Sequence, residues 1–342
     1  MNYRTRTERL RTRHPFGISR STEQEFAFAF LEIPAGVHVG LGEAAPASYY
    51  GGETEETALA FFERLRGVEL EDEFSPAEFM RPLREATEFD GAAKAAVDMA
   101  LWDLWGKRSG EPVFEGLGLP PPRPKATSFT VGIDSPEAME RKVLEAKDYP
   151  VLKVKVGTPN DEENLQRVRA RHKGALRVDA NAAWSPEEAP RRIERLARFD
   201  LELVEQPIDP KEGREGWRYV KDRVAVPLVA DESARVASDL AALEGVADGV
   251  NIKLMKCGGL SAARRMAREA KKRGLKVMLG CMIETSLAIT AAFHLSSLAD
   301  WLDLDGHLLL ADDPFEGVRE AGPGVLAMPL GGVAGLGVSA RR

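Results

Sequence analysis

The fold is decided by five short stretches of the chain, which are LKVKVG at residues 152–157, RVDAN at 177–181, LVEQP at 203–207, VADES at 229–233 and NIKL at 251–254. Each stretch contains a short apolar run rich in β-branched residues, as buried strands do, and each carries an ionisable residue near its end. These ionisable residues follow one another at steps of 24, 26, 26 and 22 residues. Because each step is about one strand–helix unit, the stretches predict parallel strands that end at the same height.

The same alternation continues on both sides of these stretches. The eight predicted strands are Thr127–Val131, Val151–Val156, Leu176–Asp179, Leu201–Glu205, Leu228–Asp231, Gly249–Leu254, Lys276–Leu279 and Asp303–Leu308. Amphipathic segments such as Glu162–His172, Glu187–Phe199 and Ser261–Arg273 lie between them, so the pattern predicts a closed α/β barrel. An open doubly wound sheet is the alternative. Such a sheet usually carries a glycine-rich first turn, and here no GxGxxG follows a strand.

A smaller α+β part precedes the barrel. Its predicted elements are a hairpin of Phe26–Leu31 and Val37–Glu43 and helices at Thr54–Leu65, Ser75–Ala86 and Gly91–Lys107. A cluster of prolines at residues 120–124 can continue neither a helix nor a central strand, and it marks the boundary. The predicted division is a capping domain at 1–122, a barrel at 123–314 and a tail at 315–342 that packs back onto the cap.

Composition excludes several classes of protein. Of the 342 residues, 44% are apolar and 30% are charged, which is typical of a folded globular chain. Two cysteines exclude a disulfide scaffold and fit a cytoplasmic location. The net charge of -7 includes no basic cluster, so a nucleic-acid partner is not expected. No window approaches 18 consecutive apolar residues and the N-terminal segment lacks an apolar core, so we expect neither a membrane span nor a signal peptide.

Three of the strand-end residues, Asp179, Glu205 and Asp231, are carboxylates. Carboxylates without histidine or cysteine partners are hard oxygen ligands that suit an octahedral Mg²⁺ with open positions for substrate. The five histidines are scattered and lack HExxH spacing, so zinc is not expected. A single aspartate at a strand end could equally be an ordinary loop residue or part of a core salt bridge. Neither explanation accounts for five ionisable residues in register on successive strands. The series predicts a Mg²⁺ site, in which Mn²⁺ is a compatible substitute.

Lysines flank these carboxylates. Lys155 and Lys253 end the second and sixth predicted strands, which lie opposite each other in an eight-stranded barrel. Lys153 lies two residues before Lys155, so both side chains point to the same side of the strand. The positive charges of Lys153 and a metal are expected to lower the pKa of Lys155, which would then act as a base. Two opposed lysines can remove a Cα proton from one face and return it to the other. The alternative is that the lysines only balance the carboxylate charge.

These motifs resemble the enolase superfamily, muconate-lactonizing subgroup, over nearly the whole chain. The matching segments are KVK at 153–155, DAN at 179–181, VEQP at 204–207, ADES at 230–233, NIKLMKCGG at 251–259 and the helix at 91–105. The resemblance implies a modified TIM barrel, (β/α)7β, with an N-terminal α+β capping domain completed by the C-terminal tail. It implies Asp179, Glu205 and Asp231 as Mg²⁺ ligands and Lys155 and Lys253 as the acid–base pair. Spacing alone does not exclude Lys256, but the family pattern assigns the base to the lysine of Asn-Ile-Lys.

Within the subgroup, Asp303-Leu304-Asp305 resembles the Asp-x-Asp of the dipeptide epimerases, which are typified by L-Ala-D/L-Glu epimerase. The resemblance implies that both aspartates hold the α-ammonium of a dipeptide, and paired carboxylates do offer a site for a cation. Arg20 lies in a segment, PFGISR at 15–20, that resembles a cap loop whose arginine binds a glutamate side chain. A surface arginine is the alternative. Further contacts with substrate are expected from Thr130, Asn181 and Met282.

The implied function is that of a Mg²⁺-dependent dipeptide epimerase. It would exchange the Cα proton of the C-terminal residue of L-Ala-L-Glu or a related dipeptide through a metal-stabilised enolate. Another reaction of the superfamily is the alternative: o-succinylbenzoate synthase, N-acylamino acid racemase or muconate cycloisomerase. Asp303 and Asp305 argue against it, because those substrates lack a free ammonium. A catalytically silent binding barrel is a remote alternative, since no ligand or base is missing. The resemblance is compatible with a homo-oligomer.

Overall fold

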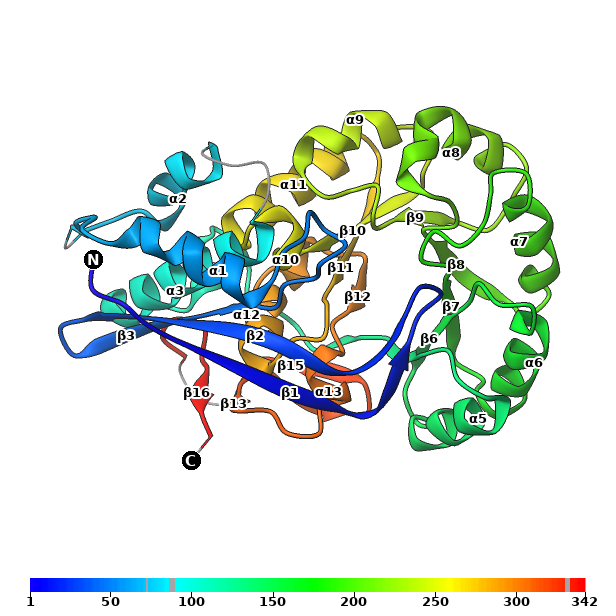
Figure 1. Ribbon diagram of the computed structural model, residues 1–342, viewed down its shortest axis with the longest axis horizontal. Coiled ribbons are helices and arrows are strands. Elements are labelled where there is room, and N and C mark those ends of the chain that lie inside the picture. Colours follow the sequence, from blue (N-terminus) through cyan, green and yellow to red (C-terminus); the bar gives the residue numbers. More distant parts are fainter. Residues whose placement is uncertain (72, 86–89, 330–332, 342) are drawn as a thin grey trace.

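The computed structural model describes residues 1–71, 73–85, 90–329 and 333–341. A three-stranded antiparallel sheet with helices stands beside a barrel of eight parallel strands (Figure 1). This arrangement confirms the predicted fold class, a modified TIM barrel with an N-terminal α+β cap. No helix in the described ranges combines the length and the apolar character needed to cross a membrane.

The sheet of the cap consists of β1 (Arg4–Gly17), β2 (Thr22–Ala35) and β3 (His38–Ala44), in that order. β2 and β3 form the predicted hairpin, with Ala35 opposite His38. Sequence reasoning missed β1. Only Thr12 and Gly17 of this edge strand are buried, so it lacks the apolar alternation by which a strand is recognised. The turn between β1 and β2 reaches toward the barrel (Figure 1).

The helices of the cap are α1 (Glu55–Phe62), α2 (Pro76–Glu85), α3 (Gly91–Ser109) and α4 (Val113–Gly116). They confirm the three predicted helices, although the predicted end at Ala86 lies outside the described residues. α3 is buried along nearly its whole length and packs on β3. A Cβ at Gly42 would overlap the carbonyl group of Ala96, so glycine there lets the helix approach the sheet closely.

The barrel strands pair in the order of the sequence. They are β5 (Phe129–Val131), β6 (Val151–Lys155), β7 (Ala175–Asp179), β8 (Leu201–Glu205), β9 (Leu228–Ala230), β10 (Gly249–Lys253), β11 (Lys276–Gly280) and β12 (Trp301–Asp303). A parallel bridge between Thr127 and Leu302 closes the ring. The helices are α5 (Pro136–Glu145), α6 (Asp161–Arg171), α7 (Ala189–Ala197), α8 (Gly213–Lys221), α9 (Leu240–Leu243), α10 (Leu254–Cys257), α11 (Leu260–Lys272), α12 (Ser286–Phe293) and α13 (Gly306–Leu309).

The predicted position of the eighth strand was wrong. The prediction was Asp303–Leu308, whereas β12 ends at Asp303 and α13 begins at Gly306. The apolar run from 301 to 310 fits a buried strand and a short helix equally well, so periodicity could not place the boundary. Asp303 therefore ends the strand, and Asp305 lies in the turn that follows it.

The interior of the barrel below the strand ends is filled by side chains. Leu203, Val229, Met278 and Trp301 form a buried cluster of their own. Leu203, Val229 and Trp301 each precede a strand-end carboxylate by two residues, so they share its face of the sheet. This floor closes the barrel and leaves its carboxyl end as the accessible side.

The tail adds short strands and returns to the cap. They are β13 (Phe315–Glu316), β14 (Arg319–Gly322), β15 (Val325–Ala327) and β16 (Ser339–Ala340), and β15 pairs with β4 (Lys125–Ala126). The carbonyl of Gly335 accepts the N–H of Val113 at 3.1 Å. The N–H of Leu336 donates to Asp103 Oδ1 at 2.9 Å. These bonds hold the tail against α3 and α4, while the domain boundaries themselves stay a prediction.

Candidate active site

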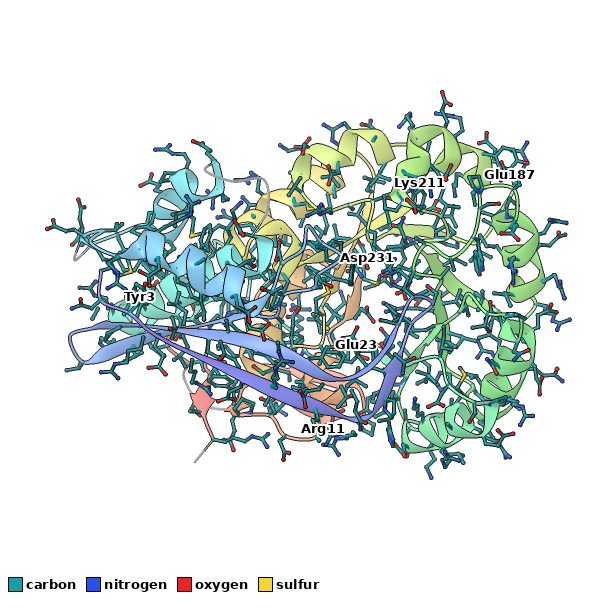
Figure 2. The ribbon with its side chains drawn as sticks, viewed as in Figure 1. Tyr3, Arg11, Glu23, Glu187, Lys211 and Asp231 are labelled. Carbon is teal, nitrogen blue, oxygen red and sulfur yellow. The ribbon has the colours of Figure 1, made fainter. Side chains whose placement is uncertain are left out.

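Three carboxylates meet at the carboxyl ends of neighbouring barrel strands. Asp179 ends β7, Glu205 ends β8 and Asp231 directly follows β9. Asp179 and Glu205 are register partners in adjacent strands. None of the three has exposed surface, and Figure 2 labels Asp231 in the barrel. Buried carboxylates need compensation, so the groups around them decide what this site can do.

Amide side chains hold two of these carboxylates in place. Asn251 Nδ2 donates to Glu205 Oε1 at 2.8 Å. Gln206 Oε1 accepts the backbone N–H of Asp231 at 2.9 Å, and its Nε2 donates to Ser233 Oγ at 2.8 Å. The amides therefore tie the ends of β8, β9 and β10 together, which limits how far the carboxylates can move.

Lysine ammonium groups lie directly against the carboxylates. Lys153 Nζ lies 2.8 Å from Glu205 Oε2 and 3.3 Å from Asp179 Oδ2. Lys155 Nζ donates to Asp179 Oδ2 at 2.6 Å, and Lys253 Nζ donates to Asp231 Oδ2 at 2.8 Å. All three lysines are buried. The structure thus brings together every lysine and carboxylate that the sequence placed at the strand ends.

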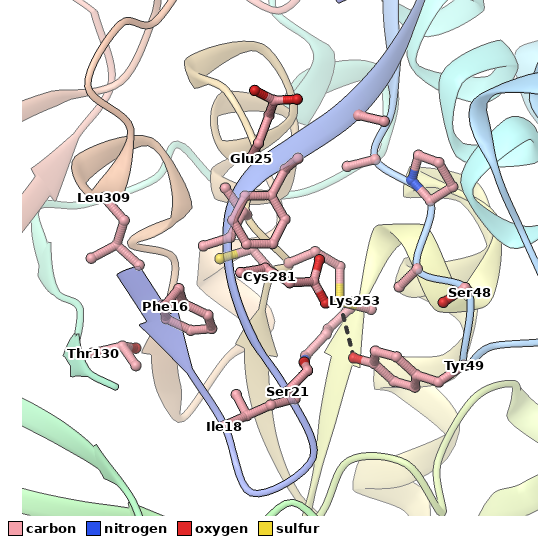
Figure 3. Close-up of a pocket in the computed structure, with 18 of the residues that line it drawn as sticks. Phe16, Ile18, Ser21, Glu25, Ser48, Tyr49, Thr130, Lys253, Cys281 and Leu309 are labelled. Carbon is pink, nitrogen blue, oxygen red and sulfur yellow. Dashed lines mark hydrogen bonds between the residues drawn. The ribbon is translucent and has the colours of Figure 1, made fainter. Parts of the chain in front are cut away.

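Lys155 and Lys253 face one pocket from opposite sides. Their strands, β6 and β10, are four positions apart in the closed ring of eight. The pocket has a volume of about 340 Å³ and lies between the barrel and the cap (Figure 3). Its wall includes Lys153 and most of the expected substrate contacts, namely Asp303, Asp305, Thr130, Asn181 and Met282. A cavity of this size accommodates a small-molecule substrate.

Lys256 is held by the protein instead of facing the pocket. Its ammonium contacts Asp231 Oδ1 at 2.5 Å and the carbonyl oxygens of Asp231, Asn251 and Ala234 at 2.6, 2.9 and 3.0 Å. An ammonium has three N–H groups, so these acceptors satisfy it completely. Among the described residues Lys256 is not part of the pocket wall, whereas Lys253 is. The geometry therefore favours Lys253 over Lys256 as a reacting group.

The two aspartates of the eighth strand are engaged unequally. Asp303 accepts bonds at both oxygens, from Ser128 Oγ at 2.5 Å and from Lys153 Nζ at 2.6 Å. Asp305 accepts the backbone N–H of Thr130 at Oδ2, at 2.6 Å, while Cys281 Sγ stands 4.0 Å from Oδ1. Oδ1 of Asp305 is therefore the carboxylate oxygen of this pair that is most open to a ligand.

Arg20 does not form part of the pocket wall among the described residues. Its Nη2 donates to Glu232 Oε1 at 2.8 Å and its Nη1 donates to the carbonyl of Asn181 at 3.0 Å. The guanidinium also lies 4.7 Å from the centre of the Tyr49 ring. Arg20 was expected to bind a substrate side chain, but its guanidinium already binds the carboxylate of Glu232.

The charges of the cluster move its pKa values in opposite directions. Burial and the neighbouring Asp179 raise the pKa of Glu205 to about 7. Burial opposes ionisation of Asp179 as well, but Lys155 and Lys153 outweigh it and lower the pKa to about 2. Burial lowers the pKa of Lys253, yet Asp231 reverses this and holds the pKa well above its usual range.

The carboxylates at the ends of β7, β8 and β9 fit a divalent cation by donor type. They are buried, come from adjacent strands and offer only oxygen, which matches the preference of Mg²⁺. Within the described ranges, no group of three His, Cys, Asp or Glu side chains has the spacing of a formed metal site. The lysine ammonium groups instead lie against the carboxylates and compensate their charge. The ligand assignment stays a proposal.

Two family models match the chain. The model of the mandelate racemase/muconate lactonizing enzyme N-terminal domain covers residues 2–118, and the model described as enolase C-terminal domain-like covers residues 137–342. The chain belongs to this family of the enolase superfamily. The resemblance inferred from the strand-end motifs is thereby confirmed, and this superfamily member carries those motifs at the carboxyl end of its barrel.

Several relatives of this superfamily member are named as epimerases. An L-Ala-D/L-Glu epimerase of Bacteroides thetaiotaomicron is 37% identical over 91% of this chain and 81% of its own. A hydrophobic dipeptide epimerase of Roseobacter litoralis is 37% identical over 90% of this chain and 91% of its own. A solved dipeptide epimerase of Enterococcus faecalis, complexed with Mg and L-Leu-L-Tyr, is 34% identical, covers 98% of both chains and has a TM-score of 0.91.

Sequence reasoning missed several residues of the site. Phe16, near the end of the unpredicted strand β1, and Ile18, in the turn that follows it, line the pocket. Glu232 follows Asp231 in the sequence, and its role as the partner of Arg20 depends on a contact 212 residues away. Tyr49, in the second loop of the cap, also lines the pocket, which is one of the two positions that the sequence left open for it. The strand-end position of Glu232 was the one available signal.

Proposed function

We propose that this protein is a Mg²⁺-dependent dipeptide epimerase, which transfers a proton at the Cα of the C-terminal residue of a dipeptide. The observation that carries the proposal is the placement of Lys155 and Lys253 on opposite sides of one pocket. The same pocket contains the carboxylates of Asp303 and Asp305, which suit a cationic group of the substrate. Two relatives that match this chain over most of their own length are named as an L-Ala-D/L-Glu epimerase and a hydrophobic dipeptide epimerase, which supports the same reaction.

Lys155 and Lys253 are the acid–base pair in this proposal. One amine removes the Cα proton from one face, and the ammonium of the other delivers a proton to the opposite face. Among the described residues, Lys155 contacts one carboxylate, Asp179, and Lys253 contacts one, Asp231. Each Nζ therefore keeps bonding directions for the pocket, unlike Lys256. Lys153 is a positioning residue that links Asp303 to Glu205 and Asp179.

Asp179, Glu205 and Asp231 would hold the Mg²⁺, for which Mn²⁺ is a substitute in this proposal. When bound, such a cation supplies positive charge that stabilises the negative charge developing on the substrate carboxylate. Asn251 and Gln206 would keep the ligands oriented, since they already bond Glu205 and the backbone of Asp231. Asp305, with its open Oδ1, and Asp303 would receive the α-ammonium at the other end of the substrate.

The test is exchange of the Cα proton with solvent. Purified protein with Mg²⁺ is incubated in D₂O with pools of L,L-dipeptides, and the products are weighed by mass spectrometry. We expect a gain of one deuterium in particular dipeptides, with inversion at the C-terminal residue shown by chiral chromatography. Chelation by EDTA and the substitution Lys155→Ala should each abolish the gain. The loss expected on removing a general acid or base is about 10²–10⁴-fold.

Exchange into N-acylamino acids but into no dipeptide would contradict the proposal and favour an acylamino-acid racemase. In that case Asp305→Asn would leave the exchange unchanged, because no ammonium is bound and the amide oxygen can still accept the N–H of Thr130. If the proposal holds, Asp303→Asn and Asp305→Asn should raise KM for dipeptides. A matched control is Asp300→Asn, because Asp300 bonds a backbone N–H near the floor of the barrel instead of facing the pocket.

A further inference from the structure

The part of the pocket wall next to the lysines includes apolar and aromatic side chains. The β1–β2 hairpin contributes Phe16 and Ile18, the segment after β3 contributes Tyr49, and the segment after β11 contributes Met282 (Figure 3). The ring centre of Phe16 lies 6.0 Å from Lys155 Nζ. The Tyr49 hydroxyl contacts the sulfur of Met282 at 3.8 Å, shown as a dashed line in Figure 3. Apolar groups therefore stand beside the reacting lysines.

This wall is where the side chain of the reacting residue has to lie. The two lysines occupy the two faces of the Cα, which leaves three directions for the carboxylate, the amide nitrogen and the side chain. If the carboxylate reaches the ends of β7–β9 and the ammonium end of the dipeptide reaches Asp303 and Asp305, as proposed above, one direction is left for the side chain. That direction leads toward the β1–β2 hairpin and Tyr49, which line the same pocket (Figure 3).

Arg20 is committed to a buried carboxylate. Glu232 is 7% exposed, and its Oε2 has no hydrogen-bond partner among the described residues. Its Oε1 accepts bonds from Arg20 Nη2 and from Asn181 Nδ2, at 2.8 and 3.3 Å. An anionic substrate that drew Arg20 away would leave Glu232 buried without its cation, and that arrangement is strongly unfavourable. Arg20 therefore anchors the turn between β1 and β2 to the barrel.

The other charges on the cap side of the pocket are mostly negative. Its acidic wall residues are Glu23, Glu25, Glu53 and Glu55. Arg9 is the cation among the described cap residues of the wall, and it pairs with Glu55 at 2.8 Å and with Glu25 at 3.8 Å. An anionic substrate side chain would be repelled by these carboxylates, and the one cation among the described residues of this part of the wall, Arg9, is already paired with Glu55 and Glu25.

We propose that the preferred substrates are dipeptides with an uncharged, apolar side chain on the C-terminal residue, and that Arg20 is a positioning residue for the β1–β2 turn. This inference rests on the proposed epimerase function. It departs from the expectation of L-Ala-L-Glu for two reasons. The arginine that would bind the glutamate side chain is paired with Glu232, and the pocket wall on the cap side combines apolar side chains with a surplus of carboxylates.

The test compares four dipeptides that differ only in the C-terminal side chain: L-Ala-L-Leu, L-Ala-L-Phe, L-Ala-L-Lys and L-Ala-L-Glu. The readout is kcat/KM for deuterium incorporation with Mg²⁺. We expect the values for Leu and Phe to exceed those for Glu and Lys at least tenfold. A value for L-Ala-L-Glu or L-Ala-L-Lys equal to that for Leu would overturn the inference and leave the epimerase function intact. Exchange in no dipeptide would overturn both.

Two variants test the role of Arg20. Arg20→Met should lower kcat/KM for every dipeptide by a common factor, because the turn loses its anchor. A selective loss for L-Ala-L-Glu would show instead that Arg20 reads the substrate. Glu232→Gln removes the charge that holds Arg20, so it should raise the ratio of L-Ala-L-Glu to L-Ala-L-Leu. No rise in this ratio, with Mg²⁺ binding measured by calorimetry unchanged, would contradict the pairing argument. Arg191→Met, exposed on α7, is the matched control.

Discussion

At the scale of single residues, two lysines three positions apart have opposite roles. Lys253 lines the pocket with one carboxylate partner, while Lys256 is surrounded by acceptors. We predict that Lys253→Ala abolishes deuterium exchange, whereas Lys256→Met keeps the reacting amine. Lys256→Met should lower the free energy of unfolding by about 3–5 kcal/mol, because it leaves Asp231 with one fewer buried cation and removes the donor to three backbone carbonyl oxygens. Exchange rates and urea unfolding curves measure the two effects separately.

The opposite pattern would contradict this assignment. If Lys256→Met folded with native stability but lost exchange, the base would be Lys256. Spacing alone could not separate the two lysines, because they lie three residues apart at the end of the same predicted strand. Only the family resemblance favoured Lys253. Their difference depends on carbonyl oxygens around Lys256: that of Asn251 lies in the preceding strand β10, and that of Ala234 is brought to Lys256 by the fold from the segment after β9.

At the scale of elements, two helices are capped by glutamates that are distant in the sequence. Glu43 on β3 accepts the N–H of Thr285 at 2.9 Å and that of Ala288 at 3.3 Å, at the start of α12. Glu53 accepts the N–H groups of Gly91 and Ala92 at the start of α3. These carboxylates accept free N–H groups of the first helical turn, which is the usual role of an adjacent N-cap residue. The carboxylate of Glu43 also joins the cap to the barrel.

We predict that Glu43→Ala destabilises the protein by about 1–3 kcal/mol, because it leaves buried N–H groups of α12 without an acceptor. Glu43→Gln should cost less, because the amide oxygen can still accept, and because burial raises the pKa of Glu43 well above its usual range. Thermal and urea unfolding of the three proteins provide the measurement. Equal stability of the alanine variant and the parent would show that this contact does not support the cap.

At the scale of the whole molecule, His294 joins three parts of the chain. It ends α12 of the barrel, its Nδ1 accepts the N–H of Phe114 in the cap at 3.1 Å, and its Nε2 lies 3.1 Å from the carbonyl of Leu336 in the tail. This pattern fits the neutral ring, with its proton on Nε2. Burial accordingly lowers the pKa of His294 to about 4.

Stability should therefore fall with acid. The pKa of His294 is 6.5 in the unfolded chain and about 4 in the folded protein. The neutral ring therefore contributes fully to the free energy of unfolding above pH 6.5, and this contribution is lost as the pH falls from 6.5 to 4. Between pH 7 and 5 we expect a loss of about 2 kcal/mol from this residue. His294→Gln should be less stable than the parent at pH 7 and should lose less on acidification. A parallel pH dependence in both proteins, measured by urea unfolding, would refute the prediction.

The sequence by itself determined the barrel and the chemistry of its rim. Strand-end residues such as Asp179, Glu205 and Lys253 recur at the length of one strand–helix unit, so local pattern alone places them at one height. Only the tertiary structure decided the end of β12, the strand β1, the partner of Arg20 and the difference between Lys253 and Lys256. Each of these depends on groups that are far apart in the chain and adjacent in space, and no local periodicity records such contacts.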